Sequence, residues 1–165
     1  MTRDPGLESW IVDASPLILL GNIGQVARLE ALAPRIKVPE AVLEEEAAGV
    51  DLDRQGGVTL AWAKVHTVPN IQVPQSIAGW DLGAGESQVV AQCLAGARRA
   101  VLDDAQARAA ARVHGVRLIG TLGVILRARR ANLIAAARPV IEQLRERGAY
   151  LDDDLAEQAL RNVGE

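Results

Sequence analysis

Short apolar runs alternate with longer alanine- and leucine-rich segments along most of the chain. Each short run is bounded by Pro, Gly or charged residues and is too short for a helix, so it predicts a buried strand. The longer segments carry apolar residues at helical spacing and predict helices. The predicted strands are residues 10–13, 36–38, 65–68, 100–102 and 116–119.

The same pattern predicts where helices begin and end. Ser15 is expected to be the N-cap of the first helix, because Pro16 then occupies the first helical position. Asp154 and Glu157 have the spacing of a capping box at the start of the last helix. A polar connection is expected over 49–57 and a loop over 70–85. The predicted helices are residues 16–20, a segment that ends at 32, and then 40–48, 84–95, 105–114, 121–130, 139–147 and 154–162.

This alternation predicts one α/β domain. Strands that alternate with helices are joined by right-handed crossovers, which produce a parallel sheet covered by helices on both faces. We therefore expect a three-layer fold with a parallel sheet of four or five short strands. A chain of 165 residues can bury one substantial core. We expect residues 9–165 to form this domain after a disordered N-terminal segment, residues 1–8.

The composition limits both the core and the cellular setting. Three Trp, one Tyr and no Phe leave an aliphatic core and argue against a surface that stacks nucleic acid bases. The single cysteine, Cys93, excludes an internal disulfide and is expected to be buried, because its helical segment is apolar. The polar N-terminal start and the lack of a long apolar segment predict a cytoplasmic protein without membrane contact.

Positive charge is concentrated in one part of a chain whose net charge is −3. Residues 98–147 contain eleven arginines and four acidic residues, whereas residues 1–97 have a net charge of −6. Because arginine favours bidentate contacts with phosphate groups, the basic segment is a candidate phosphate-binding surface. A solvated helix surface or a protein interface explains the charge equally well. Arg127, Arg129 and Arg130 are the expected contacts if the ligand is a nucleic acid.

Acidic residues stand where predicted strands end. Asp13 follows the first strand, and Asp103 with Asp104 follows the strand at 100–102. Helix capping and the helix dipole explain one carboxylate at such a position. Two adjacent carboxylates repel each other, however, so the second one indicates another role. Because the carboxyl ends of parallel strands meet at one edge of a sheet, these acids are expected to lie close together there.

Further acidic residues lie near the starts of two predicted helices. Glu86 follows a glycine-rich segment, and the triplet Glu44, Glu45 and Glu46 lies in the helix after the second strand. The helix dipole alone explains Glu86, and a solvated helix face explains the triplet. If the four acidic positions converge, they require a cation, and carboxylate oxygens suit Mg²⁺ or Mn²⁺. Metal ions held by carboxylates activate water for phosphodiester hydrolysis.

Five short motifs, in this order, resemble the PIN domain. The closer resemblance is to a prokaryotic PIN-like branch related to VapC-type toxins. Each motif alone is weak, but five in order with compatible spacing are fairly specific. The motifs are Val-Asp13-x-Ser15-Pro-Leu, Val38-Pro39-x-x-Val42-x-x-Glu45, Gly85-Glu86-Ser87, Asp103-Asp104-x-x-Ala-Arg108 and Gly-Thr121-Leu-Gly123.

The resemblance implies a metal-dependent ribonuclease that uses Mg²⁺ or Mn²⁺ to cut RNA. The metal ligands that it implies are Asp13, Glu86, Asp103 and Asp104. It implies a further catalytic acid, Glu45. The residues that it implies for substrate binding are Ser15, Arg108 and Thr121. One acid of the Asp103–Asp104 pair is expected to face the metal and the other to cap the following helix.

Alternatives stay open at this point. Helix capping explains Thr121 equally well, and an ion pair with Asp104 is the favoured explanation of Arg108, one helical turn away. A small antitoxin protein is an implied partner. A homodimer is also expected, because residues 17–32 carry more apolar surface than one sheet face covers. The main alternative function is a PIN-fold binding or assembly module with weak or no nuclease activity.

Overall fold

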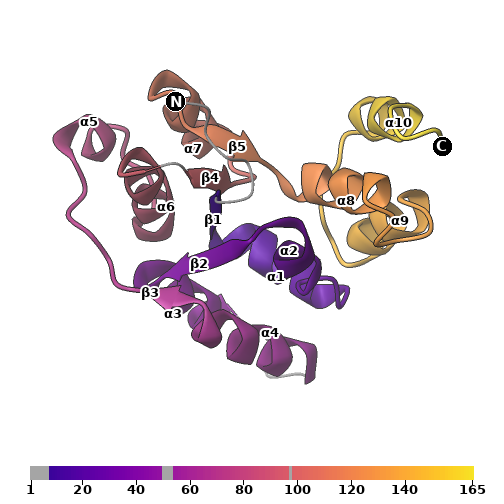
Figure 1. The fold of residues 1–165 in the computed structure, drawn as a ribbon, viewed down its shortest axis with the longest axis horizontal. Helices are drawn as coiled ribbons and strands as arrows, with labels where there is room; N and C mark the ends of the chain where they lie inside the picture. The colour runs from indigo at the N-terminus through magenta and orange to yellow at the C-terminus, as the bar shows by residue number, and fades with distance from the viewer. Residues whose placement is uncertain (1–7, 50–53, 97) are drawn as a thin grey trace.

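Five short parallel strands form the centre of the molecule (Figure 1). They are seen in a computed structural model that describes residues 8–49, 54–96 and 98–165. The order across the sheet is β3-β2-β1-β4-β5, so the first strand is central. The expected α/β fold with a parallel sheet is therefore confirmed. The strands are β1 (Ser9–Val12), β2 (Arg35–Pro39), β3 (Thr67–Val68), β4 (Arg98–Val101) and β5 (Arg117–Ile119).

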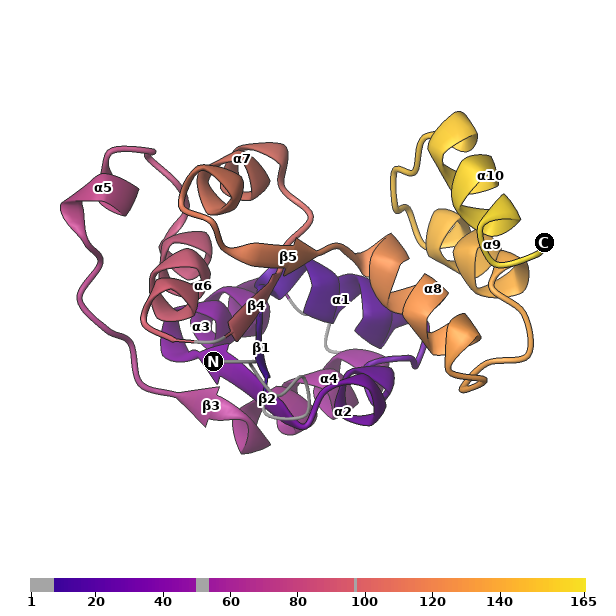
Figure 2. The same ribbon diagram turned by 45° about the horizontal axis from the view of Figure 1, so that its top comes forward.

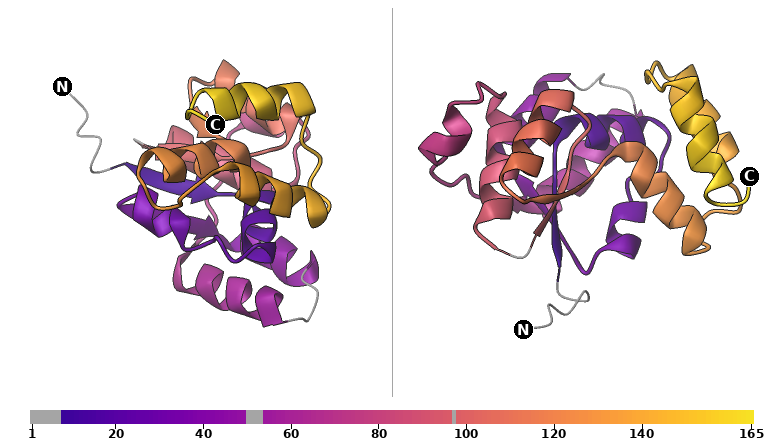
Figure 3. Two further views of the ribbon diagram at one scale, coloured as in Figure 1. Left: turned by 90° about the vertical axis from the view of Figure 1, so that its right-hand side faces the viewer. Right: turned by 90° about the horizontal axis from the view of Figure 1, so that it is seen from above.

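Helices cover both faces of this sheet. Helices α6 and α7 lie on one side, and α1 and α8 lie on the other (Figure 2; Figure 3, right). Within the described residues, no helix combines the length and apolarity needed to cross a membrane. The helices are α1 (Ala14–Asn22), α2 (Arg28–Leu32), α3 (Glu40–Gly49), α4 (Arg54–Val65), α5 (Gln75–Ala78), α6 (Ala84–Leu94), α7 (Ala105–Val113), α8 (Thr121–Arg130), α9 (Arg138–Glu146) and α10 (Asp153–Arg161).

The strand register brings three chain segments to one edge of the sheet. Val12 pairs with Val101, and Val101 pairs with Ile119, so β1, β4 and β5 end at the same level. Two backbone hydrogen bonds continue the ladder past these ends. The Asp13 amide donates to the Val101 carbonyl at 3.1 Å, and the Leu102 amide donates to the Ile119 carbonyl at 3.0 Å. The residues that follow each strand are therefore held side by side.

Several predicted helix boundaries were wrong. Asp13, not Ser15, is the N-cap of α1, and Pro16 is the third helical residue. Proline is tolerated there because amides of the first turn have no intrahelical partner. Asp152 caps α10 by accepting the amide of Leu155 at 2.9 Å, so the predicted capping box does not form.

Two expected connections contain helix. Residues 54–57 belong to α4 rather than to a polar connection, and α5 lies inside the expected loop. The part of that connection at 50–53 lies outside the described residues. Neither helix has a strong sequence signal, because α4 has a Gly-Gly pair in its first turn and α5 has only four residues. Helix α4 packs against α1 and α3, so tertiary contacts stabilise it.

The early helices bury their large apolar side chains within the chain itself. Leu17, Leu20 and Leu29 are fully buried, and α8 and α9 pack against this region. The apolar surface that suggested a homodimer is therefore largely covered, and the homodimer stays a prediction. Cys93 is also buried, as expected, and burial raises the pKa of its thiol to about 12.

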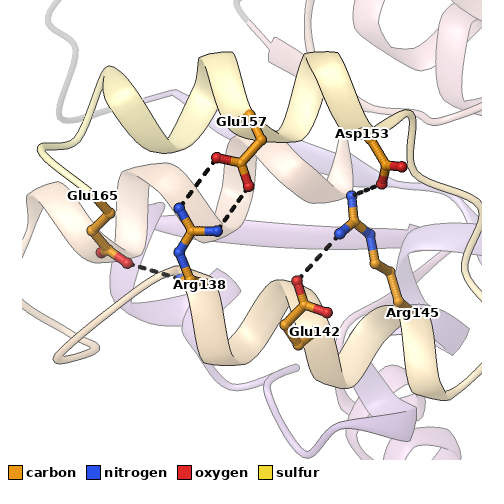
Figure 4. A network of polar contacts seen from close by, with 6 residues as sticks. All are labelled: Arg138, Glu142, Arg145, Asp153, Glu157 and Glu165. Atoms are coloured by element: carbon orange, nitrogen blue, oxygen red, sulfur yellow. Dashed lines mark hydrogen bonds and ion pairs between the residues drawn. The ribbon is translucent and has the colours of Figure 1, made fainter.

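Helices α9 and α10 form a pair outside α8 (Figure 2). Figure 4 shows that Arg138 makes two hydrogen bonds to Glu157, of 2.8 and 3.3 Å, and that Arg145 reaches Asp153 at 2.9 Å. Glu165 accepts the amide of Arg138 at 2.9 Å. Such exposed ion pairs stabilise little, so their main effect is on the orientation of the two helices. The buried apolar residues of the pair are Val140, Ile141, Leu144, Ala156, Ala159 and Leu160.

Arginines gather at the opposite, amino-terminal ends of the strands. Glu8 accepts a 3.3 Å hydrogen bond from Arg99 Nε and forms a 2.6 Å ion pair with Arg117. The guanidinium carbon of Arg127 lies 5.6 Å from the ring centroid of Trp10, a cation–π contact. Glu8 belongs to the segment expected to be disordered, of which residues 1–7 lie outside the described residues. Arg127 therefore packs on Trp10, in the second half of α8, whereas Thr121 is at the start of this helix.

Candidate active site

An open cavity of about 350 Å³ lies at the carboxyl edge of the sheet. Three of the predicted acidic residues line it, Asp13, Glu45 and Glu86. They come from the end of β1, from α3 and from the first turn of α6. Ser15 also lines this cavity, although it caps no helix. The cavity therefore joins four residues from three separate segments of the chain.

Asp13 is the most buried acid of this cavity. Its side chain is 3% exposed, and Oδ1 is buried with no hydrogen-bond partner among the described residues. Burial raises the pKa of Asp13 to about 7 from a usual 3.8, although the amide of Ala14 opposes the shift. The negative charges of Glu86, Glu45 and Asp103 raise it further. A cation at Oδ1 would relieve both effects.

Two glycine amides hold the glutamates of the cavity. Glu45 Oε1 accepts the Gly85 amide at 2.8 Å, and Glu86 Oε2 accepts the Gly83 amide at 3.2 Å. Gly85 is needed for the first contact, because a Cβ there would lie 2.8 Å from Glu45 Oε2. Burial raises the pKa of Glu86, as do the charges of Asp104 and Glu45, against the effect of the Gly83 amide.

The members of the glutamate triplet differ in position. Glu44 is exposed and does not line the cavity, whereas Glu45 does. Glu46 is fully buried, and neither carboxylate oxygen has a hydrogen-bond partner within the described residues. Burial raises the pKa of Glu46 to about 7. The triplet thus contains one acid in the cavity and one isolated acid in the interior.

The two aspartates after β4 have different partners. Asp103 accepts two hydrogen bonds from Thr121, from its amide at 2.8 Å and from its hydroxyl at 2.6 Å. Thr121 is 2% exposed and is the first helical residue of α8, whose N-cap is Gly120. The hydroxyl of Thr121 therefore fixes the Asp103 carboxylate rather than capping the helix. A Cβ at Gly120 would lie 3.0 Å from both Asp103 Oδ1 and Arg108 Nη1.

Asp104 is the N-cap of α7. Its Oδ1 accepts the amide of Ala107 at 2.9 Å. The expected ion pair between Asp104 and Arg108 is absent from the described residues. Arg108 instead donates from Nη1 to the Leu102 carbonyl at 2.8 Å. This bond turns the guanidinium toward the end of β4, beside Asp103, where burial and the charge of Arg112 lower its pKa.

Replacing Asp104 with Ala is expected to lower the free energy of unfolding by about 1 kcal/mol, because the Ala107 amide loses its acceptor. Asp104→Ser is the matched control, since serine retains the cap and removes the charge. Urea unfolding of both variants at pH 7 measures the difference. Equal stabilities of the Ala and Ser variants would show that the cap contributes nothing.

The donors suit a hard divalent cation, but they are not gathered around a single point. Asp13 Oδ1 is a buried oxygen without a partner in the described parts of the chain, and carboxylates are preferred ligands of Mg²⁺ and Mn²⁺. Over the described part of the chain, however, no group of three or more Asp, Glu, His or Cys side chains is close enough to hold a metal ion. The glycine amides that engage Glu45 and Glu86, together with mutual repulsion, explain the separation.

A second and larger cavity, of about 730 Å³, adjoins the acidic one. The two share Ser15 and Leu19, and the second contains Arg108 and Thr121. Sequence reasoning missed its far wall, which includes Tyr150. A signal was present, because Tyr150 is the single tyrosine of a chain poor in aromatic residues and lies in a predicted connection between helices.

Comparison with known proteins identifies the family. Residues 9–165 match the sequence profile of a family described as PIN domain. A search of curated proteins gives no match. The profile covers all five strands and the residues of both cavities, including Asp13, Glu45, Glu86 and Asp103. The chain therefore belongs to the PIN domain family.

Proposed function

We propose that this protein is a Mg²⁺- or Mn²⁺-dependent ribonuclease. PIN domains are generally nucleases, and they generally use divalent metal ions. The observation that carries the proposal is Asp13, a buried carboxylate in an open cavity that it shares with Glu45 and Glu86. One of its oxygens has no hydrogen-bond partner among the residues that the structure describes. Such a charge is costly to bury without a partner, which favours a cation as its ligand.

Each acidic residue has a place in this proposal. Asp13 and Glu86 would hold the ion together with the Asp103–Asp104 pair. Each aspartate of the pair affects the pKa of a different acid. The charge of Asp103 raises the pKa of Asp13, and the charge of Asp104 raises that of Glu86. When bound, the ion would lower the pKa of a water molecule and stabilise the leaving oxygen of the phosphodiester. Glu45 lines the same cavity as Asp13 and could accept a proton from that water.

Thr121 and Arg108 would position groups near the acids. Thr121 holds Asp103 through two hydrogen bonds, so it is a positioning residue. Arg108 keeps a positive charge at the end of β4, where it could contact a phosphate of RNA. Ser15 lies between the two cavities and could donate its hydroxyl to the same backbone.

A PIN-fold binding module without nuclease activity is the second candidate. The observation in its favour is the separation of the acids, since the described residues contain no group of three metal-binding side chains. The two functions differ in their response to metal. A nuclease requires a divalent ion for cleavage, whereas a binding module associates with RNA or protein without one.

The deciding experiment is cleavage of a labelled single-stranded RNA with Mg²⁺, with Mn²⁺ and with EDTA. We expect cleavage with either ion and none with EDTA. Glu86→Gln is expected to lose cleavage because it removes the charge that would bind the ion. The variant should remain folded, because Glu86 is partly exposed and Gln has nearly the same shape as protonated Glu. Wild-type protein that binds RNA but leaves it intact with both ions would support the binding module.

Gly85→Ala is expected to lower the cleavage rate at least tenfold while changing stability by less than about 1 kcal/mol. The new methyl group would meet Glu45 Oε2 at 2.8 Å and displace this flexible carboxylate from the cavity wall. Gly83→Ala is the matched control, because a Cβ there lies 3.6 Å from Glu86 Oε2, an ordinary contact. Cleavage kinetics and thermal unfolding of both variants test this. Equal rates for the two variants would remove Glu45 from the proposed site.

A further inference from the structure

The larger cavity is a groove with one polar end and one apolar end. We call it the α8–α10 groove, since α8, α10 and the connection before α10 form its walls. The polar end contains Asp103, Arg108 and Thr121 and adjoins the acidic cavity. The leucines of its walls are Leu19, Leu122, Leu126, Leu144, Leu151 and Leu155.

The polar end has features that suit a phosphate group. The Arg108 guanidinium has five N–H donors, and one of them bonds the Leu102 carbonyl. Helix α8 begins here, so the positive end of its dipole faces the same space. The one acid at this end, Asp103, has both oxygens engaged by Thr121. Repulsion of an anion by Asp103 is therefore offset by two donors and an adjacent guanidinium.

The apolar end is bordered by an aromatic ring. Tyr150 is 93% exposed, although it lines the groove together with buried leucines such as Leu144. It follows Gly148, whose φ of +91° turns the chain after α9 in a way that other residues rarely adopt. The turn presents the ring at the rim of the groove rather than in the core. An exposed aromatic ring beside an apolar wall is a surface on which a nucleobase can stack.

We propose that the α8–α10 groove binds one nucleotide of the RNA substrate, next to the phosphodiester that is cut. Its phosphate would lie at Arg108 and its base between Tyr150 and the leucine wall. The proposal rests on the proposed ribonuclease function and names the part of the substrate that this second cavity receives. A volume of about 730 Å³ is within the range of roughly 300–1,000 Å³ that small-molecule sites occupy.

Two observations favour a nucleotide over a protein partner. The groove continues into the acidic cavity through Ser15 and Leu19, so one extended ligand can occupy both. The positive charge of Arg108 also lies at the end of the groove that adjoins the acidic cavity. The phosphate of a nucleotide next to the cut phosphodiester would lie at this end. The competing occupant is a second copy of this chain, because Leu155 is 56% exposed and apolar. The composition alone predicted no base-stacking surface, and Tyr150 provides a single stacking position rather than a broad surface.

The test compares Tyr150→Ala with Tyr150→Phe. Binding of a fluorescein-labelled single-stranded RNA, about 12 nucleotides long, is measured by anisotropy in EDTA. All proteins carry Asp13→Asn, which prevents cleavage. We expect Tyr150→Ala to weaken binding roughly 5- to 150-fold, the range for loss of one stacked base, and Tyr150→Phe to restore most of the affinity. Val113→Ala is the control, since Val113 is exposed and apolar but lies outside the groove.

An RNA of the same length with abasic sites separates stacking from charge. The Tyr150→Ala effect is expected to disappear on this RNA, because its phosphates remain and its bases do not. Equal binding of the Ala and Phe variants to the ordinary RNA would overturn the proposal, while cleavage by the wild-type protein would leave the ribonuclease function intact. Weaker binding that accompanies a change from dimer to monomer in light scattering would assign the groove to a second copy and overturn it as well. A wild-type protein that neither binds nor cuts RNA would refute both proposals.

Discussion

Asp13→Asn is expected to abolish metal-dependent cleavage and, at the same time, to stabilise the metal-free protein. The substitution keeps the shape of the side chain and removes its charge. Cleavage should fall by at least roughly 10²–10³-fold, the loss typical of one essential electrostatic group. The free energy of unfolding at pH 8 should rise by up to about 4 kcal/mol. Burial raises the pKa of Asp13 from 3.8 to about 7, so the ionised side chain destabilises the folded protein, and Asn carries no such charge.

Manganese binding gives a second measurement on the same variant. A ligand present at 100 times its Kd stabilises a protein by about 2.7 kcal/mol. For a chain of this size, that corresponds to an increase in Tm of about 5–10 °C. We expect Mn²⁺ to raise the Tm of the wild-type protein and not that of Asp13→Asn. If Mn²⁺ stabilises both proteins equally, the acids do not form a metal site.

Glu46→Gln is the matched control for this experiment. Glu46 is also a buried acid without a hydrogen-bond partner among the described residues, and its pKa is also raised to about 7. It does not line the acidic cavity, however. The variant should therefore gain stability without losing cleavage or the response to Mn²⁺. A loss of cleavage in Glu46→Gln would mean that Asp13→Asn acts through the core rather than through the metal.

The stability of the metal-free protein is expected to depend on pH through these two acids. Both have a higher pKa in the folded than in the unfolded chain, so the folded protein binds more protons between about pH 4 and pH 7. Their contribution therefore favours folding at low pH and is lost as the pH rises through 7. The loss is about 4 kcal/mol for Asp13 and about 3 kcal/mol for Glu46.

Urea unfolding from pH 4 to pH 8 measures this dependence, and the variants isolate it. Asp13→Asn and Glu46→Gln mimic the protonated acids, so each should match the wild-type protein near pH 4 and exceed it at pH 8. Other acids, such as Glu157 beside Arg138, affect all three proteins alike. A constant difference between variant and wild type across this range would show that these acids do not titrate near pH 7. Saturating Mn²⁺ should remove the difference for Asp13 and leave that for Glu46.

The sheet edge that carries Asp13 and Asp103 was predictable from local pattern. Short apolar runs between helices require a parallel sheet, and such a sheet places the residues after its strands together. In the structure, β1 and β4 pair so that Val12 lies beside Val101, at the ends of both strands. The long, periodic helices α6 and α8 were predictable for the same reason, since their pattern alone determines their bounds.

Side-chain partners were not predictable, because they depend on contacts between distant segments. Arg108 has Asp104 one helical turn away, yet it bonds the Leu102 carbonyl, just after the end of β4. Asp103 is held by Thr121, eighteen positions later. The choice between Ser15 and Asp13 as the N-cap also depended on the sheet, because β1 ends at Val12 and the helix starts directly after Asp13.

The arginine-rich segment shows the same limit on a larger scale. The sequence places Arg127 and Arg129 on one helix after Thr121, which suggests a continuous track for RNA. In the structure, Arg127 lies over Trp10 and Arg129 Nε donates to Glu165 at 3.1 Å. Arg108, by contrast, lies in the larger cavity together with Asp103. Charge in a sequence therefore did not reveal which arginines are free to bind a ligand.

The central position of the first strand has a consequence for synthesis of the protein. β1 leaves the ribosome early, but its partner β4 begins only at Arg98, and Thr121 follows later still. Domains tend to fold as units as the chain emerges, and pairing distant strands is slow. A growing chain therefore cannot place Asp103 beside Asp13 until most of the domain has been translated. The strand order therefore delays assembly of the acidic cavity and its surroundings until β4 and the start of α8 have been synthesised.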